Sequence, residues 1–391
     1  MRLSLFSRSA RASTNAAPRT RTVRHCAFAA ITIALTASHA PAQPAADPSR
    51  PQLVVLITVD QLRPDYLTRW RSEFTGGLAR FMKQGAFFTN ASHDHAVTET
   101  APGHASLGSG RHPRSTGIVR NDAGVSDPQA PLIDGGRGGG ASPDRFRGTS
   151  LFDWMRSIDQ WARGLSVSRT DLGAILPIGR AKQSAFWYST DGRFVTSRYY
   201  ADTLPSWVRA FNERDFIGAL QGARWTTRKP ASAYPEPDSV RRENSGRDFV
   251  FPHLLPDSAA RRALMLTEYP VMDSLTVQLA LAGIDAMKLG AGSSTDFIGL
   301  SLSTTDAIGH RYGPDSREVH DQLLSVDHYL GQFIDSLFRT RDSSRILFAI
   351  SSDHGVAPYP ELTFVGTDSA RGRVDIRPTM ARGRSALAAF G

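Results

Sequence analysis

The chain has 391 residues, of which 40% are hydrophobic and 21% are charged, a composition typical of a globular protein and unlike that of a disordered one. Its one cysteine, Cys26, excludes an internal disulfide and any metal site built from several thiolates. The formal charge of +9 would suit a nucleic-acid partner, but six arginines and no acid lie within residues 1–42. The rest of the chain carries only +3, so we expect no nucleic-acid polymer as a partner.

The N-terminal segment is organised like an export signal. A basic stretch precedes an apolar run at 26–37, and Ala40 and Ala42 are small residues spaced as in a cleavage site. The apolar run is shorter than the roughly 20 residues that a spanning helix needs. We therefore expect residues 1–42 to be a signal peptide, with a periplasmic or secreted mature protein that has no membrane span. A transit peptide of mitochondrial type is the alternative, because the segment is rich in arginine and free of acids.

Strand and helix patterns alternate along the rest of the chain. Residues 53–59 form a continuous apolar, β-branched run, which is typical of a strand buried on both faces. Further patterns predict strands at 86–90, 165–167, 174–176, 297–302 and 346–350, and helices at 76–84, 150–163, 275–289 and 317–339. This alternation predicts an α/β fold with a mostly parallel central sheet flanked by helices.

The domain organisation follows from changes in composition. We expect a first part of the core at 43–180, an irregular inserted cap region at 181–270 and a second part of the core at 271–366. Residues 367–391 form an arginine- and glycine-rich tail. The aromatic residues of the cap would either stack on a nucleobase or form part of a hydrophobic core, and the sequence leaves both open.

Acids and histidines follow three of the predicted strands. Asp60 comes directly after 53–59, Asp306 and His310 follow 297–302, and Asp353 and His354 follow 346–350. Ligand sites of parallel sheets lie beyond the carboxyl ends of the strands. Taken singly, each residue could be a helix cap, a turn residue or part of a surface pair. Together, oxygen and imidazole donors without thiolate favour zinc or, less specifically, manganese.

A threonine at the start of a predicted helix is a second candidate. Thr100 precedes Pro102, which suits an early helical position. A threonine in such a place is commonly a plain N-cap. The same position also presents an oxygen at the positive end of a helix, where a phosphate can bind, and a nearby metal would lower the pKa of that hydroxyl.

Six motifs, in this order, resemble the alkaline phosphatase superfamily. The resemblance covers about residues 52–360 and is strongest to the branch that contains type I phosphodiesterase/nucleotide pyrophosphatases and the phosphate-irrepressible, PafA-like alkaline phosphatases. The matching segments are VDQLRPDYL at 59–67, TETAPGHASLGSG at 98–110, GAILPIG at 173–179, AFWYSTDGRFVTSRYY at 185–200, STTDAIGHRYGPDS at 303–316 and SSDHG at 351–355.

The resemblance implies a zinc-dependent phosphoric ester hydrolase that uses a phospho-threonine intermediate. Thr100 would be the nucleophile, and Asn121 would donate a hydrogen bond to a phosphoryl oxygen. One zinc ion would be held beside Thr100 and a second nearby. The implied ligands are Asp60, Asp353 and His354, with Thr100 beside them, for the first ion, and Asp306 and His310 for the second. Such a pair of cations clamps the attacking and leaving oxygens of an in-line displacement.

Two departures from the family pattern bear on the substrate and on activity. Family monoesterases carry a lysine and an arginine where this chain has Thr170 and Leu172, so we expect phosphodiesters to be preferred over monoesters, with Arg169 and Lys182 as candidate substrate contacts. No histidine follows His354, although the family supplies a downstream histidine to the second ion. We therefore expect a C-terminally truncated family member.

Two alternatives to an active hydrolase remain. The first is a truncated, non-catalytic remnant of the family with an incomplete metal site. The second is an isomerase similar to phosphoglycerate mutase or phosphopentomutase, which the predicted export signal disfavours. The expected partner of the hydrolase is a small phosphate ester, which includes nucleotides.

Overall fold

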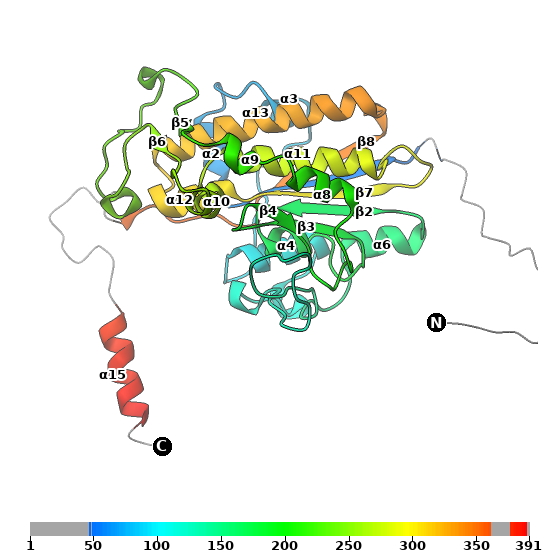
Figure 1. Ribbon diagram of the computed structural model, residues 1–391, viewed down its shortest axis with the longest axis horizontal. Helices are drawn as coiled ribbons and strands as arrows, with labels where there is room; N and C mark the ends of the chain where they lie inside the picture. Colours follow the sequence, from blue (N-terminus) through cyan, green and yellow to red (C-terminus); the bar gives the residue numbers. More distant parts are fainter. Residues whose placement is uncertain (1–46, 48, 361–375, 389–391) are drawn as a thin grey trace, which may run out of the picture. The chain divides into compact units, whose positions relative to one another are not determined.

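A six-stranded, mostly parallel sheet forms the centre of the computed structural model (Figure 1). The structure describes residue 47, residues 49–360 and residues 376–388, so the predicted signal peptide at 1–42 lies outside the described residues. The order of the strands is β4 (Arg193–Val195), β3 (Ser184–Ser189), β2 (Gly164–Ser168), β7 (Asp296–Leu302), β1 (Leu53–Val59) and β8 (Ile346–Ser351). Only β4 at the edge is antiparallel to its neighbour, which confirms the predicted fold class.

The register of the central strands aligns their carboxyl ends. Val59 at the end of β1 pairs with Leu302 at the end of β7, and Thr58 pairs with Ser351 at the end of β8. The residues that follow these three strands therefore begin at one edge of the sheet. This edge is where a doubly covered parallel sheet places its ligand site.

The two faces of the sheet differ in side-chain size. Along β1 the alternate residues Val55, Ile57 and Val59 enter the main hydrophobic core, which follows from the two-residue period of a strand. The opposite face has small residues near its centre, such as Ser166 and Gly299. Small side chains there let the helices of that layer approach the strands closely.

Helices cover both faces of the sheet (Figure 1). On the large-residue face lie α3 (Gly77–Gln84), α8 (Ser206–Asn212), α11 (Val271–Ala286) and α13 (Arg317–Thr340). On the small-residue face lie α4 (Thr100–Ser109), α6 (Leu151–Ile158) and α7 (Asp171–Ile175). The other α-helices of the described residues are α2 (Pro64–Arg69), α5 (Pro113–Thr116), α9 (Phe216–Ala219), α10 (Ala259–Met265), α12 (Thr304–Tyr312) and α15 (Arg377–Ala388).

The region between β4 and α11 is mostly irregular and contains a two-stranded ribbon, β5 (Arg224–Trp225) and β6 (His253–Leu254). Two of its aromatic side chains are hydrogen-bonded to α13. Trp225 Nε1 donates to Asp321 Oδ2 at 2.7 Å, and Tyr234 Oη donates to Asp321 Oδ1 at 2.5 Å. Both aromatic residues are buried in the main core, which favours the core alternative over the stacking of a nucleobase for these two residues.

Three expected elements differ from the structure. Residues 86–90 form no strand, because all five are exposed and no layer of the fold buries their apolar side chains. Residues 174–176 lie in and just after the helix α7, because the Thr170 hydroxyl caps it by accepting from the Gly173 amide at 3.1 Å. The expected cap region at 181–270 includes β3 and β4, so only the segment after β4 lies outside the central sheet.

Among the described helices, none combines the length and the apolar character that crossing a lipid bilayer requires.

Candidate metal centre

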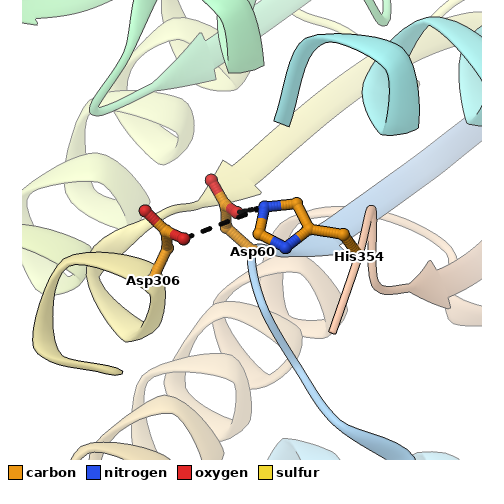
Figure 2. A group of neighbouring side chains, drawn as sticks. All are labelled: Asp60, Asp306 and His354. Carbon is orange, nitrogen blue, oxygen red and sulfur yellow. Dashed lines mark ion pairs between the residues drawn. The ribbon is translucent and has the colours of Figure 1, made fainter. Parts of the chain in front are cut away.

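Three chain segments that are far apart in the sequence bring Asp60, Asp306 and His354 together (Figure 2). Asp60 follows β1 directly, Asp306 lies in the first turn of α12 after β7, and His354 lies in the loop after β8. One ligand atom from each lies within 4.8 Å of the others. The structure thus places these three predicted ligands at the carboxyl edge of the sheet.

Asp60 is a buried carboxylate in an anionic environment. Its side chain is fully buried, and neither oxygen accepts a hydrogen bond from the described residues, although Oδ1 lies 3.2 Å from His354 Nε2. Burial and the nearby charge of Asp353 raise the pKa of Asp60 to about 7. A buried acid with free oxygens is costly unless a cation compensates its charge, so this arrangement fits a bound metal.

The imidazole of His354 is oriented as a ligand. Its Nδ1 lies 2.8 Å from the carbonyl oxygen of Gly355, so Nδ1 carries the hydrogen in the neutral ring and Nε2 presents its lone pair to Asp60. Burial opposes protonation, but Asp60 and Asp353 outweigh it and raise the pKa of His354 to about 10. In the absence of a metal, the protonated imidazole would therefore supply part of the missing positive charge.

Asp353 contacts His104, a residue that the sequence analysis did not identify. His104 Nδ1 lies 3.0 Å from Asp353 Oδ2, and His104 Nε2 lies 2.9 Å from Ser301 Oγ. Burial opposes the charge of Asp353, but its contact with His104 lowers its pKa to about 2. His104 stands one helical turn after Thr100, and that i, i+4 spacing was the available signal.

His310 extends the cluster toward solvent. Its Nε2 lies 3.2 Å from Asp306 Oδ1, and 68% of its side chain is exposed. The contact with Asp306 raises the pKa of His310.

Gln61 was also missed by the sequence analysis. Its backbone amide donates to Asp353 Oδ1 at 3.1 Å, and its side-chain amide donates to Asp306 Oδ1 at 2.7 Å. Its place directly after Asp60 in the motif was the only signal.

Thr100 is the first residue of α4, and Glu99 occupies the N-cap position without a side-chain cap bond. The Thr100 hydroxyl therefore does not cap the helix. Its Oγ1 lies 3.4 Å from His354 Nε2, and the side chain is buried. Helix α4 reaches this position because Gly103 has no side chain: an added Cβ would lie 2.2 Å from the backbone oxygen of Asp353.

Asn121 is oriented next to Thr100 by two hydrogen bonds. Its side-chain oxygen accepts from the Ala101 amide at 2.8 Å, and its backbone amide donates to Glu99 Oε2 at 2.7 Å. The first bond fixes the amide plane and leaves the Nδ2 group, which has no hydrogen-bond partner among the described residues, as a free donor. The structure thus places Asn121 beside the start of α4.

The two predicted basic contacts are placed differently. Arg169 follows β2 at the same edge of the sheet as Asp60, and its charge acts on the buried carboxylate of Asp273. Lys182 precedes β3, so it lies at the amino end of a parallel strand, and its Nζ lies over the ring of Tyr199 at 5.3 Å from the centroid. The structure therefore does not bring Lys182 to Thr100.

Comparison with known proteins places these features in a family. The model of the family described as type I phosphodiesterase / nucleotide pyrophosphatase matches residues 54–383. The chain is 34% identical over 330 residues to alkaline phosphatase PafA of Elizabethkingia meningoseptica and 32% identical over 331 residues to alkaline phosphatase PhoV of Synechococcus elongatus. These matches cover 79% and 80% of this chain, which spans 60% of the length of each relative.

The solved structures give the same result. The crystal structure of wild-type alkaline phosphatase PafA matches with a TM-score of 0.77 at 31% identity, over 87% of this chain and 69% of that chain. The resemblance found in the sequence motifs is therefore confirmed for both sequence and fold.

Proposed function

The chain belongs to the type I phosphodiesterase / nucleotide pyrophosphatase family, and we propose that it is an exported, zinc-dependent phosphoric ester hydrolase. The convergence of Asp60, Asp306 and His354 beside the Thr100 hydroxyl is the observation that carries this proposal. The similar proteins named alkaline phosphatase support the reaction class.

The donor set fits zinc. Asp60, Asp353 and His354 would hold one ion beside Thr100, and Asp306 and His310 would hold a second. Carboxylate oxygens and imidazole nitrogens are ordinary zinc ligands, and neither oxygen of Asp60 accepts a hydrogen bond from the described residues. When bound, the two ions would polarise the phosphoryl group and stabilise charge on the attacking and leaving oxygens.

The reaction we propose proceeds in two displacements at phosphorus. Thr100 Oγ1 loses its proton and forms a bond to phosphorus while the bond to the ester oxygen breaks. That oxygen leaves with the bonding electrons and takes up a proton, so the proton balance of the step is zero. Water then displaces Thr100 from the phospho-threonine, which releases phosphate or a phosphate monoester and restores the hydroxyl. The free Nδ2 group of Asn121 donates to a phosphoryl oxygen in both steps.

We propose that phosphodiesters are preferred over monoesters. A monoester carries a second negative charge, which family monoesterases neutralise with two cations at the positions of Thr170 and Leu172. Here Thr170 caps α7 and Leu172 packs beside the hydrophobic core. Arg169 is the remaining basic candidate at this edge. The substrate would be a small phosphate ester, nucleotides included, hydrolysed in the periplasm or outside the cell.

The proposal is tested with Thr100→Ala and the matched control Thr98→Ala, which removes an exposed threonine hydroxyl from the segment just before α4. We expect Thr100→Ala to lose hydrolysis of aryl phosphate esters, whereas Thr98→Ala retains it. Metal analysis should find two zinc ions per chain. Unchanged turnover in Thr100→Ala would remove the nucleophile assignment.

The non-catalytic alternative has one observation in its favour, the exposed His310, which with Asp306 makes only two protein ligands for the second ion among the described residues. A folded protein that binds at most one zinc ion and has no zinc-dependent turnover of either ester class would establish that alternative. Faster turnover of aryl monoesters than of matched diesters would instead contradict only the substrate preference.

A further inference from the structure

A cavity of about 830 Å³ opens beside His310. One wall is the exposed side of α12, with Ala307, His310 and Arg311. The other wall comes from residues 244–269 of the segment between β4 and α11. A predicted ligand of the second ion thus forms part of the wall, so the cavity adjoins the reaction centre directly.

A series of contacts connects the nucleophile to a residue that lines this cavity. Thr100 Oγ1 lies 3.4 Å from His354 Nε2, which lies 3.8 Å from Asp306 Oδ1, which in turn lies 3.2 Å from His310 Nε2. Thr100 and His310 therefore stand at opposite ends of a chain of contacts. In an in-line displacement the leaving group departs opposite the attacking oxygen. Because His310 also lines the cavity, a leaving group held at the His310 end of these contacts would have the cavity beside it.

The cavity presents two unpaired guanidinium groups. Arg247 and Arg261 line it, both are exposed, and neither side chain makes a hydrogen bond or an ion pair with the described residues. The third arginine, Arg311, is already engaged by the carboxylates of Glu268 and Asp248.

Most acids of the cavity already pair with basic side chains. Besides its contact with Arg311, Asp248 has an oxygen 3.3 Å from the buried imidazole of His253. Asp257 is the remaining acid, and its carboxylate makes no ion pair within the described chain. Two unpaired positive charges and one unpaired negative charge therefore line the cavity. The excess positive charge favours the binding of an anion.

We propose that this cavity binds the leaving group of the ester and selects leaving groups that carry an oxyanion of their own, through Arg247 and Arg261. The inference rests on the proposed function, because it uses Thr100 as the attacking group. It adds the substrate class: phosphoric esters whose departing alcohol bears a carboxylate or a further phosphate-like group. A guanidinium offers paired N–H donors that match the two oxygens of either group.

The experiment compares esters that share the transferred group and differ in the leaving group. The substrates are methyl phenyl phosphate and its analogues with a 4-carboxylate or a 4-phosphonate on the phenyl ring. For each enzyme the measured quantity is the ratio of kcat/KM for the charged ester to that for methyl phenyl phosphate. Comparing this ratio between variants cancels the intrinsic reactivity of each phenol, and the two arms separate a carboxylate preference from a phosphonate preference.

We expect Arg247→Ala/Arg261→Ala to lower at least one of these ratios about fivefold or more, because both partly exposed charge contacts are lost. Asp257→Asn should raise the same ratio, because it removes the opposing charge. Arg224→Ala is the matched control: it removes an exposed arginine on β5 that does not line the cavity, and it should leave the ratio unchanged. Ratios in the double variant equal to those of the wild type in both arms would overturn the proposal.

An equilibrium measurement separates this inference from the proposed function. Calorimetric binding of 4-hydroxyphenylphosphonate, the product of the phosphonate arm, is measured in Thr100→Ala with and without the two arginine substitutions. Weaker binding without the arginines supports the cavity assignment even if no ester is hydrolysed, in which case only the proposed function fails. Equal affinity with and without the arginines, or no binding to either protein, would overturn the cavity assignment even if hydrolysis is normal.

Discussion

Gly103 offers the sharpest test of how the fold positions the nucleophile. It lies one turn into α4, and an added Cβ would lie 2.2 Å from the backbone oxygen of Asp353 and 2.7 Å from its backbone carbon. Real Cβ atoms are not found under 3.0 Å from such atoms, so Gly103→Ala must shift α4 away from the β8 loop by about 1 Å. Alanine favours a helix over glycine by about 1 kcal/mol, but overpacking costs about 1–3 kcal/mol and acts in the opposite direction.

The same shift separates Thr100 from the ligands on the β8 loop. The hydroxyl lies 3.4 Å from His354 Nε2 in the native arrangement, and a displacement of about 1 Å between reacting groups can lower a rate by about 100-fold. We expect Gly103→Ala to reduce kcat/KM for an aryl phosphate ester to that extent, with a lower melting temperature. Gly139→Ala is the control, because a Cβ there has open space. Gly103→Ala with kcat/KM within twofold of the wild type would refute the close-approach argument.

Three further predictions follow from the centre. In metal-free protein the pKa of His354 is raised to about 10, so the stability that its protonation contributes is complete below the unfolded pKa of 6.5 and is lost as the pH rises toward 10. The melting temperature of protein treated with a chelator should therefore fall between pH 7 and 10. A melting temperature that stays constant over this range would contradict the argument. Asn121→Ala should lower kcat by about 10²-fold through loss of a preorganised donor, and an effect on KM alone would argue against that role. His104→Asn should weaken zinc affinity about 10–100-fold, because Asp353 loses the partner that keeps it ionised and oriented. Competition with a chelator measures this affinity, and an affinity equal to that of the wild type would contradict the prediction.

The sequence predicted the central strands, and the convergence of Asp60, Asp306 and His354, because both depend on local patterns. The apolar run at 53–59 forms β1 over the same residues, and the expected run at 346–350 forms β8 with one more residue. Buried parallel strands need continuous apolar stretches, and such stretches are visible without any tertiary information. The acids and histidines directly after them could then be placed together by the topology of the sheet alone.

Predictions from the sequence were wrong where contacts with distant residues decide which structure a segment adopts. Residues 174–176 read as a short apolar strand, yet they lie at the end of a capped helix, because a run of three apolar residues cannot distinguish the two. Lys182 was a candidate substitute for the missing cations, but it precedes β3 and lies at the amino end of that strand. His104 acts on Asp353 from a different element, so no periodicity within α4 identified its partner.

The centre depends on an asymmetry of the sheet that no single motif expresses. Small residues such as Ser166 and Gly299 lie on the face that α4 and α7 cover, and Ser301 on that face contacts His104 of α4. Larger side chains there would hold α4 away from the strands. Thr100 would then lie too far from His354 for both to contact the same metal ion. The predicted ligands lie at the ends of the strands, whereas we expect the distance from Thr100 to them to depend on side-chain size within the sheet. Enlarging Gly299, where an added Cβ would lie 2.7 Å from Ser166 Oγ, should therefore impair turnover more than metal binding.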